Sequence, residues 1–167
     1  MSFIRLFLAT VEQSGRIAAI LLYFLSFLIL FDASMRYGFA SGSIMLQELE
    51  WHLFDLIILL SIAFTLKHHR HVRVDIFYHR MSMRIRKIID LIGYVLLVVP
   101  FSAVVIYVGF DFVMMSYVQM EGSADPGGLP YRFVIKATMI IGFGLLIMQA
   151  IAHTIALLNE LLSGEVH

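Results

Sequence analysis

Residues 67–87 read KHHRHVRVDIFYHRMSMRIRK, and this basic segment decides how the rest of the chain is arranged. It contains seven of the twelve lysines and arginines of the chain. The segments on either side of it are strongly apolar and long enough to cross a bilayer. Short basic loops between membrane spans are retained on the cytoplasmic side. We therefore predict that residues 67–87 form a cytoplasmic loop that orients the other segments.

The composition indicates an integral membrane protein. Of the 167 residues, 60% are hydrophobic and only 14% are charged, and the mean hydropathy is +0.90. A soluble domain needs a far more polar surface. The formal net charge is zero, which gives no indication of nucleic-acid binding, and the chain has no cysteine for disulfides, thiolate metal sites or nucleophiles. Because no phosphate loop, catalytic triad or HExxH motif is present either, we predict neither an enzyme nor a cofactor.

The apolar runs predict an all-α membrane protein with four transmembrane helices in a single domain over residues 1–167. The expected spans cover about residues 17–35, 53–66, 88–112 and 133–158. An amphipathic segment precedes the first span, and an interfacial helix over residues 43–52 leads into the second. The connections opposite the basic segment carry few cations, so we expect both termini to be cytoplasmic.

Several short-range signals predict local structure. Asp32 and Arg36, four residues apart, should form a salt bridge near the end of the first span. Ser43 suits the N-cap of the next helix. Pro100 removes a backbone hydrogen bond and should kink the third span. Residues 125–128, DPGG, fit a turn with proline in its second position and glycine in its third.

Polar residues are concentrated at the start of the second span, where Glu48, Glu50, Trp51, His52 and Asp55 occur within eight positions. Trp51 suits the membrane interface. Glu48, His52 and Asp55 share one helical face. Because charged groups are costly in contact with lipid, that face should point toward protein or water.

Acidic residues within the spans could mark an ion path. The candidates are Asp32, Asp55, Asp90 and Asp111, and each lies near a span end by the boundaries above. Pairing or snorkelling accounts for them better at such positions. An alternative function remains, namely a small channel or exporter acting as a homo-oligomer, with Asp55 and Asp111 lining its path.

The histidines do not favour a haem or metal site. His52 and His153 lie at depths that differ by about 25 Å at the helical rise, too far apart to ligate one iron. The histidines of the basic segment are interleaved with arginines, whose charge disfavours cation binding; they are His68, His69, His71 and His79.

Arg132 and Lys136 lie four residues apart at the start of the fourth span. Like charges at this spacing repel, and the positive end of the helix dipole disfavours cations there. We therefore predict that both side chains pair with acids, either Asp111, Glu121 or Asp125 of this chain or an acid of a partner subunit.

Three features together resemble the small membrane subunit of tripartite ATP-independent periplasmic (TRAP) transporters, the DctQ-like family. They are the acids and tryptophan that begin the second span, the HVRVD sequence at residues 71–75, and the layout of four spans. Residues 121–136, EGSADPGGLPYRFVIK, are similar to the branch associated with mannitol, chloroaromatic or keto-acid uptake. The interface and structural candidates are Glu48, Glu50, Trp51, His52, Asp55, His71, Arg73, Asp75, Asp111, Arg132 and Lys136.

The resemblance implies a scaffold subunit of the bacterial inner membrane that has no substrate site of its own. In this family a large membrane subunit, DctM-like, binds substrate and sodium, and a soluble periplasmic binding protein delivers the substrate. The resemblance therefore implies these two protein partners, in addition to membrane lipids, and an organic acid as the substrate.

Overall fold

The computed structural model describes residues 2–68 and 81–163, and within these ranges the regular structure is helical. The helices are α1 (Ser2–Gly38), α2 (Ile44–Lys67), α4 (Met83–Gly93), α5 (Val99–Val118) and α6 (Phe133–Ser163), and a π-helical segment η1 (Tyr94–Val98) joins α4 to α5. Counting α4, η1 and α5 as one, the described part of the chain has four helices long and apolar enough to cross a membrane. The prediction of four spans is confirmed.

The bounds of α2 show where Asp55 lies along its helix. The expected interfacial helix and second span are one unbroken helix, α2, which begins at Ile44 and contains 24 residues. At the helical rise α2 is about 36 Å long, little more than the hydrocarbon core. Asp55 lies at its midpoint. Asp55 therefore lies near the start of the expected second span, residues 53–66, and at the middle of the helix that contains this span.

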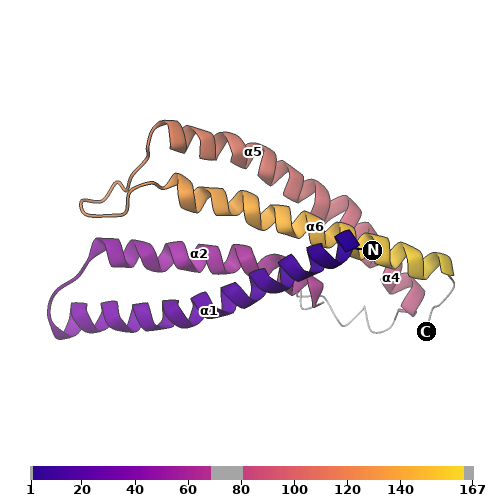
Figure 1. Ribbon diagram of the computed structural model, residues 1–167, viewed down its shortest axis with the longest axis horizontal. Helices are drawn as coiled ribbons and strands as arrows, with labels where there is room; N and C mark the ends of the chain where they lie inside the picture. Colours follow the sequence, from indigo (N-terminus) through magenta and orange to yellow (C-terminus); the bar gives the residue numbers. More distant parts are fainter. Residues whose placement is uncertain (1, 69–80, 164–167) are drawn as a thin grey trace.

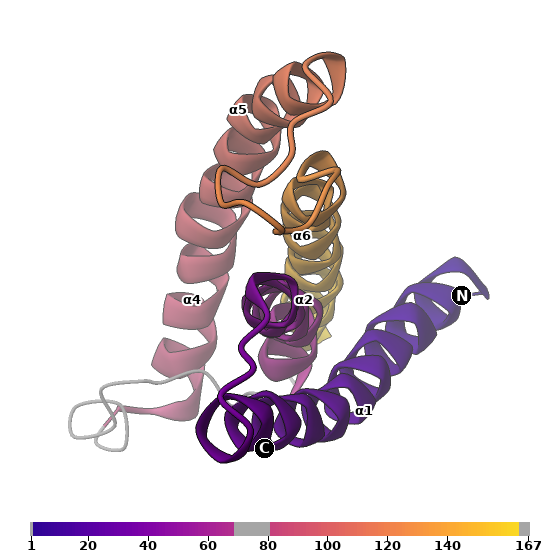
Figure 2. The same ribbon diagram turned by 90° about the vertical axis from the view of Figure 1, so that its left-hand side faces the viewer.

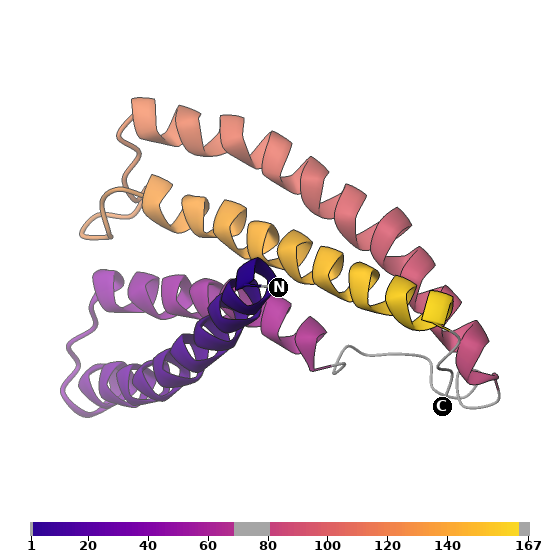
Figure 3. The same cartoon turned by 45° about the vertical axis from the view of Figure 1, so that its right-hand side comes forward.

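The four long helices form a single open layer, and do not close into a bundle. α1 packs on α2, α2 packs on α6, and α6 packs on α5, whereas α1 has only a minor contact with α6. Seen end-on, the helices follow one another in this order (Figure 2). The connections 39–43 and 119–132 lie at the same end of the layer, which we call the loop end (Figures 1 and 3). The end of α2 and the start of α4 lie at the opposite end, which we call the basic end.

Three small apolar clusters hold the layer together. Leu25 and Leu28 of α1 pack with Leu53 of α2. A second cluster joins three helices through Val11, Ala63 and Leu145, and a third joins α2, η1 and α6 through Leu66, Tyr94, Leu146 and Ala150. In each span, at most 28% of the most apolar window is buried within the chain. The broad faces of the layer are therefore free to contact lipid or another protein.

A glycine allows α2 and α6 to approach closely. A β-carbon built on Gly142 would lie 2.8 Å from the carbonyl oxygen of Leu59. Small residues at helix contacts bring membrane helices close enough for extensive van der Waals packing. Gly142 therefore sets the separation of the two central helices of the layer.

A π-helical turn precedes Pro100, the position at which a kink is expected. The segment η1 ends two residues before Pro100, and the amide of Val99 donates to the carbonyl of Tyr94, five residues back. A proline has no amide hydrogen to donate, so one carbonyl of the preceding turn loses its usual partner. The wider turn changes the hydrogen-bond register just before the proline, and the span continues through it.

Two local predictions at the loop end are confirmed. The Ser43 side chain accepts a hydrogen bond from the amide of Leu46 at 3.4 Å, which caps α2. In the DPGG turn, the amide of Gly128 donates to the carbonyl of Asp125 at 3.0 Å. Gly127 has φ +85°, which the third position of a type II turn requires.

Candidate functional site

Glu48 on the first turns of α2 fastens the connection 119–132 to the helical layer. Its side chain is 6% exposed. One carboxylate oxygen accepts hydrogen bonds from the Ser123 hydroxyl and, at 3.1 Å, from Arg132 Nη2. The other accepts from the Leu129 amide at 2.5 Å. Because the acceptors of a buried carboxylate are expensive to leave unpaired, these bonds fix the loop against α2.

The two cations at the start of α6 are both paired, as predicted. Lys136 forms an ion pair with Glu121, which was among the expected acids. Arg132 pairs instead with Glu48, which the prediction did not include, and its guanidinium carbon lies 5.7 Å from the ring centre of Trp51. Each cation is therefore offset by a specific acid.

The ion pair with Lys136 also changes the acidity of Glu121, which lies in the loop outside the spans. The hydrogen bond from Lys136 is the main cause that lowers the pKa of Glu121. The ammonium of Lys136 lies 4.0 Å from the ring centre of Phe112 on α5. Lys136 thus ties α6 to both the loop and α5.

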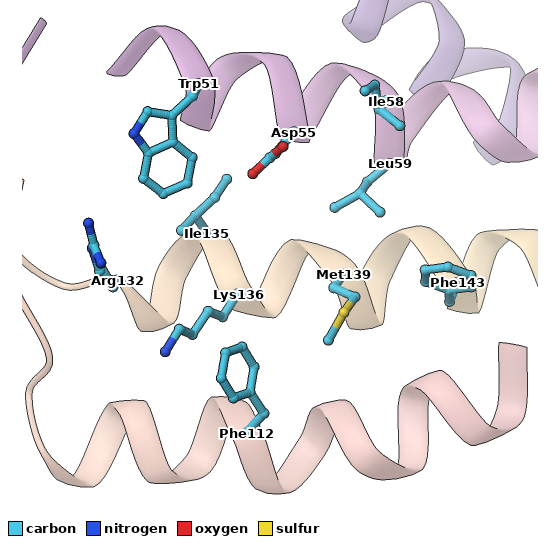
Figure 4. Close-up of a pocket in the computed structure, with 10 residues that line it drawn as sticks. All are labelled: Trp51, Asp55, Ile58, Leu59, Phe112, Arg132, Ile135, Lys136, Met139 and Phe143. Carbon is cyan, nitrogen blue, oxygen red and sulfur yellow. The ribbon is translucent and has the colours of Figure 1, made fainter. Parts of the chain in front are cut away.

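A crevice of about 370 Å³ lies between α2, α5 and α6, next to these ion pairs (Figure 4). We call it the outer crevice. Trp51, Arg132 and Lys136 lie toward the loop end, and Asp55 points from α2 toward α6 (Figure 4). The remaining lining residues are apolar: Ile58, Leu59, Phe112, Ile135, Met139 and Phe143.

Asp55 forms no hydrogen bond or ion pair with the residues that the structure describes. A charged aspartate near the centre of a membrane helix costs about 2.5 to 3.5 kcal/mol when nothing compensates it. Such intramembrane acids face protein or water and mark functional positions by default. Asp55 is therefore the principal candidate for a contact beyond this chain.

A second buried acid lies near the end of α1. Asp32 is fully buried and pairs with Arg36 at 2.5 Å, which confirms the predicted salt bridge. Oδ1 of Asp32 and Oε1 of Glu50 are both buried without a hydrogen-bond partner among the described residues. Arg36 thus compensates one oxygen of Asp32 directly.

Two lysines at the basic end pair with acids of other helices. Lys67 contacts Glu12 of α1 at 2.7 Å and also donates to the carbonyl of Leu8. Lys87 contacts Glu160 of α6 at 3.0 Å. The ends of the basic segment are therefore attached to α1 and α6.

Residues 25–160 match the family described as "Tripartite ATP-independent periplasmic transporters, DctQ component". The chain belongs to the DctQ family. No curated protein and no solved structure shows a significant match. The matched residues of this DctQ subunit include all of α2, the connection 119–132 and the outer crevice. DctQ is a component of a transporter and is not an enzyme family.

The remaining candidate residues of the DctQ subunit are dispersed. His52 stacks on Trp51 with ring centres 3.9 Å apart and lines a second depression on the α2–α6 contact. Asp111 is exposed and lines a shallow hollow at the loop end of α5. His71, Arg73 and Asp75 lie outside the described residues.

Two structural partners were missed by the sequence reasoning. Ser123 and Glu160 attach the loop and α4 to the layer, but neither belongs to a motif. The signal for Ser123 was present in part, because its hydroxyl also accepts from the Asp125 amide in the turn that the DPGG sequence predicts. Ser123 and Glu48 are 75 residues apart in the sequence, and no sequence pattern indicates their contact.

Proposed function

We propose that this DctQ subunit is a scaffold in a sodium-driven transporter that takes up an organic acid across the bacterial inner membrane. It associates with a large membrane subunit, DctM-like, that binds the substrate and the sodium ions. A periplasmic binding protein delivers the substrate. The family match over residues 25–160 carries this proposal.

The open layer supports a scaffold role. Its helices contact mainly their neighbours in the row, and most of the apolar surface of each span stays uncovered. In transport by an elevator mechanism, one domain slides against a fixed part of the membrane protein. A broad layer with large uncovered faces enlarges such a fixed part.

The orientation with both termini in the cytoplasm belongs to the same proposal. The basic segment connects the second and third spans, and an even number of spans returns the chain to the side on which it began. The positive-inside rule then places the basic end in the cytoplasm and the loop end in the periplasm.

Reconstitution tests the scaffold role. Proteoliposomes containing this subunit, the large subunit and the binding protein should take up substrate when sodium is supplied outside. Proteoliposomes containing this subunit alone should take up none. Sodium-driven uptake or ion conduction by this subunit alone would overturn the scaffold proposal and favour the homo-oligomeric channel.

A further inference from the structure

The outer crevice has an excess negative charge. The cations that line it are engaged, because Arg132 pairs with Glu48 and Lys136 pairs with Glu121. The carboxylate of Asp55 has no partner within the described part of the chain. A cation supplied by an occupant of the crevice would balance this charge.

The depth of Asp55 restricts what that cation can belong to. Asp55 lies seven residues beyond Glu48 on α2, about 10 Å further from the loop end. Glu48 is at the level where the connection 119–132 covers the helices. A lipid headgroup stays near the membrane interface, so its ammonium group would have to leave the interface to reach Asp55. A lysine or arginine of a transmembrane helix can lie at this depth.

The shape of the crevice also suits a helix. α6 lies between α2 and α5 in the layer, and residues of all three line the crevice. A groove between neighbouring helices accepts the side-chain ridge of a third helix. Beyond Asp55, toward the basic end, the lining is apolar, as a membrane-spanning partner requires.

We propose that a transmembrane helix of the large subunit docks in the outer crevice and that a lysine or arginine of this helix pairs with Asp55. The inference rests on the proposed function, because it takes the large subunit as the partner. It specifies the face of the layer that makes the contact and the charge that the partner contributes.

Co-purification of the complex tests the charge pair. The tagged small subunit is expressed with its large subunit as wild type, as Asp55→Asn and as Asp111→Asn, which is the matched control. Asp111 is also an acid with no partner in the described residues, but it lies outside the crevice. Loss of one partner of a buried charge pair weakens binding more than about tenfold.

Asp55→Asn should therefore reduce the recovered large subunit by about tenfold or more, and Asp111→Asn should leave it unchanged. The small subunit purified alone should show the same thermal midpoint, or a higher one, for Asp55→Asn as for wild type. Undiminished recovery with Asp55→Asn, or an equal loss with Asp111→Asn, would overturn the proposal.

Photo-crosslinking tests the location. A photoreactive amino acid replaces Met139 inside the crevice, or Phe143 if the first variant does not fold. The control position is Val134, which lines the second depression on the α2–α6 contact. The crevice positions should crosslink to a peptide of the large subunit that contains a lysine or arginine, identified by mass spectrometry. An adduct formed only with lipid or with a second copy of this chain contradicts the proposal.

The two experiments also separate this inference from the function on which it rests. If the wild-type subunits co-purify but only Val134 crosslinks to the large subunit, the docking site is wrong and the scaffold function stands. If the wild-type subunits do not co-purify at all, the proposed function itself is wrong.

Discussion

At the scale of single residues, Glu48 shows how one buried acid can organise a loop. Its two oxygens accept hydrogen bonds from a hydroxyl, a backbone amide and a guanidinium group. The donors come from the two sides of the DPGG turn and from the start of α6. Glu48 therefore determines where the turn lies relative to α2, whereas the turn residues determine its local conformation.

Glu48→Gln should lower stability substantially. The substitution leaves the Arg132 guanidinium without its acid, and removing one partner of an ion pair that is largely buried is strongly destabilising. Thermal unfolding of the purified subunit in detergent measures the effect. Glu50→Gln is the control on the same helix, because Oε1 of Glu50 has no hydrogen-bond partner among the described residues. Equal losses for the two variants would contradict this role of Glu48.

Stability should depend on the ionisation of Glu121. Its pKa lies below the ordinary value of 4.5, chiefly because Lys136 donates a hydrogen bond to it. The stabilisation is therefore fully present above pH 4.5 and is lost as the pH falls through the lowered pKa. The difference in thermal midpoint between wild type and Lys136→Met should be largest near neutral pH and should shrink below about pH 4.5.

A second substitution separates pairing from snorkelling. Lys136→Met leaves Glu121 without its cation, so adding Glu121→Gln should restore part of the lost stability. If Lys136 acted only by snorkelling to the interface, Lys136→Met would change the thermal midpoint little at any pH.

At the scale of the elements, the contact between α2 and α6 joins the two halves of the layer. α1 packs on α2 and α5 packs on α6, so the contact between the central helices couples both pairs. Its closeness depends on Gly142, which faces the backbone of Leu59. An alanine at this position would have the higher helix propensity but would place its methyl group against that backbone.

Gly142→Ala should destabilise the subunit by about 1 to 3 kcal/mol, the usual cost of overpacking, because the new methyl group meets backbone that cannot rotate away. Gly144→Ala is the matched control on the same helix, since a β-carbon there meets nothing within 4 Å. The control should be neutral or more stable by up to about 1 kcal/mol, from the higher helix propensity of alanine. Thermal unfolding of both variants checks this, and a stable Gly142→Ala subunit would refute the close contact.

At the scale of the whole molecule, the two ends of the layer carry different features. The basic end carries the segment that should set the orientation, and Lys67 and Lys87 attach its ends to α1 and α6. The loop end carries the pairs around Glu48 and Glu121 and the outer crevice. Changes at the basic end should therefore affect insertion, and changes at the loop end should affect assembly.

Reversal of charge at Arg84, Arg86 and Lys87 to glutamate should disturb membrane insertion, because it removes the cations that hold the loop in the cytoplasm. Single cysteines at Ser41 and Ser82, one at each end, report the orientation through their accessibility to a membrane-impermeant reagent. The absence of native cysteine makes the assignment direct. Lys87→Gln is the control, because it removes the contact with Glu160 and only one charge. Intact topology with lost transport would instead make the basic segment a functional contact.

Hydropathy, helix capping and turn chemistry act over a few residues, so the sequence by itself determined the four spans, the Ser43 cap and the DPGG turn. It also determined that Lys136 needed an acid, because its position in the first turn of a membrane helix is costly alone. Only the tertiary structure decided that Arg132 pairs with Glu48, 84 residues away, and that Asp55 lies in a crevice at the middle of α2. These features depend on which helices are neighbours in the layer. Neighbours are selected by the packing of surfaces from distant parts of the chain, and that selection leaves no local pattern in the sequence.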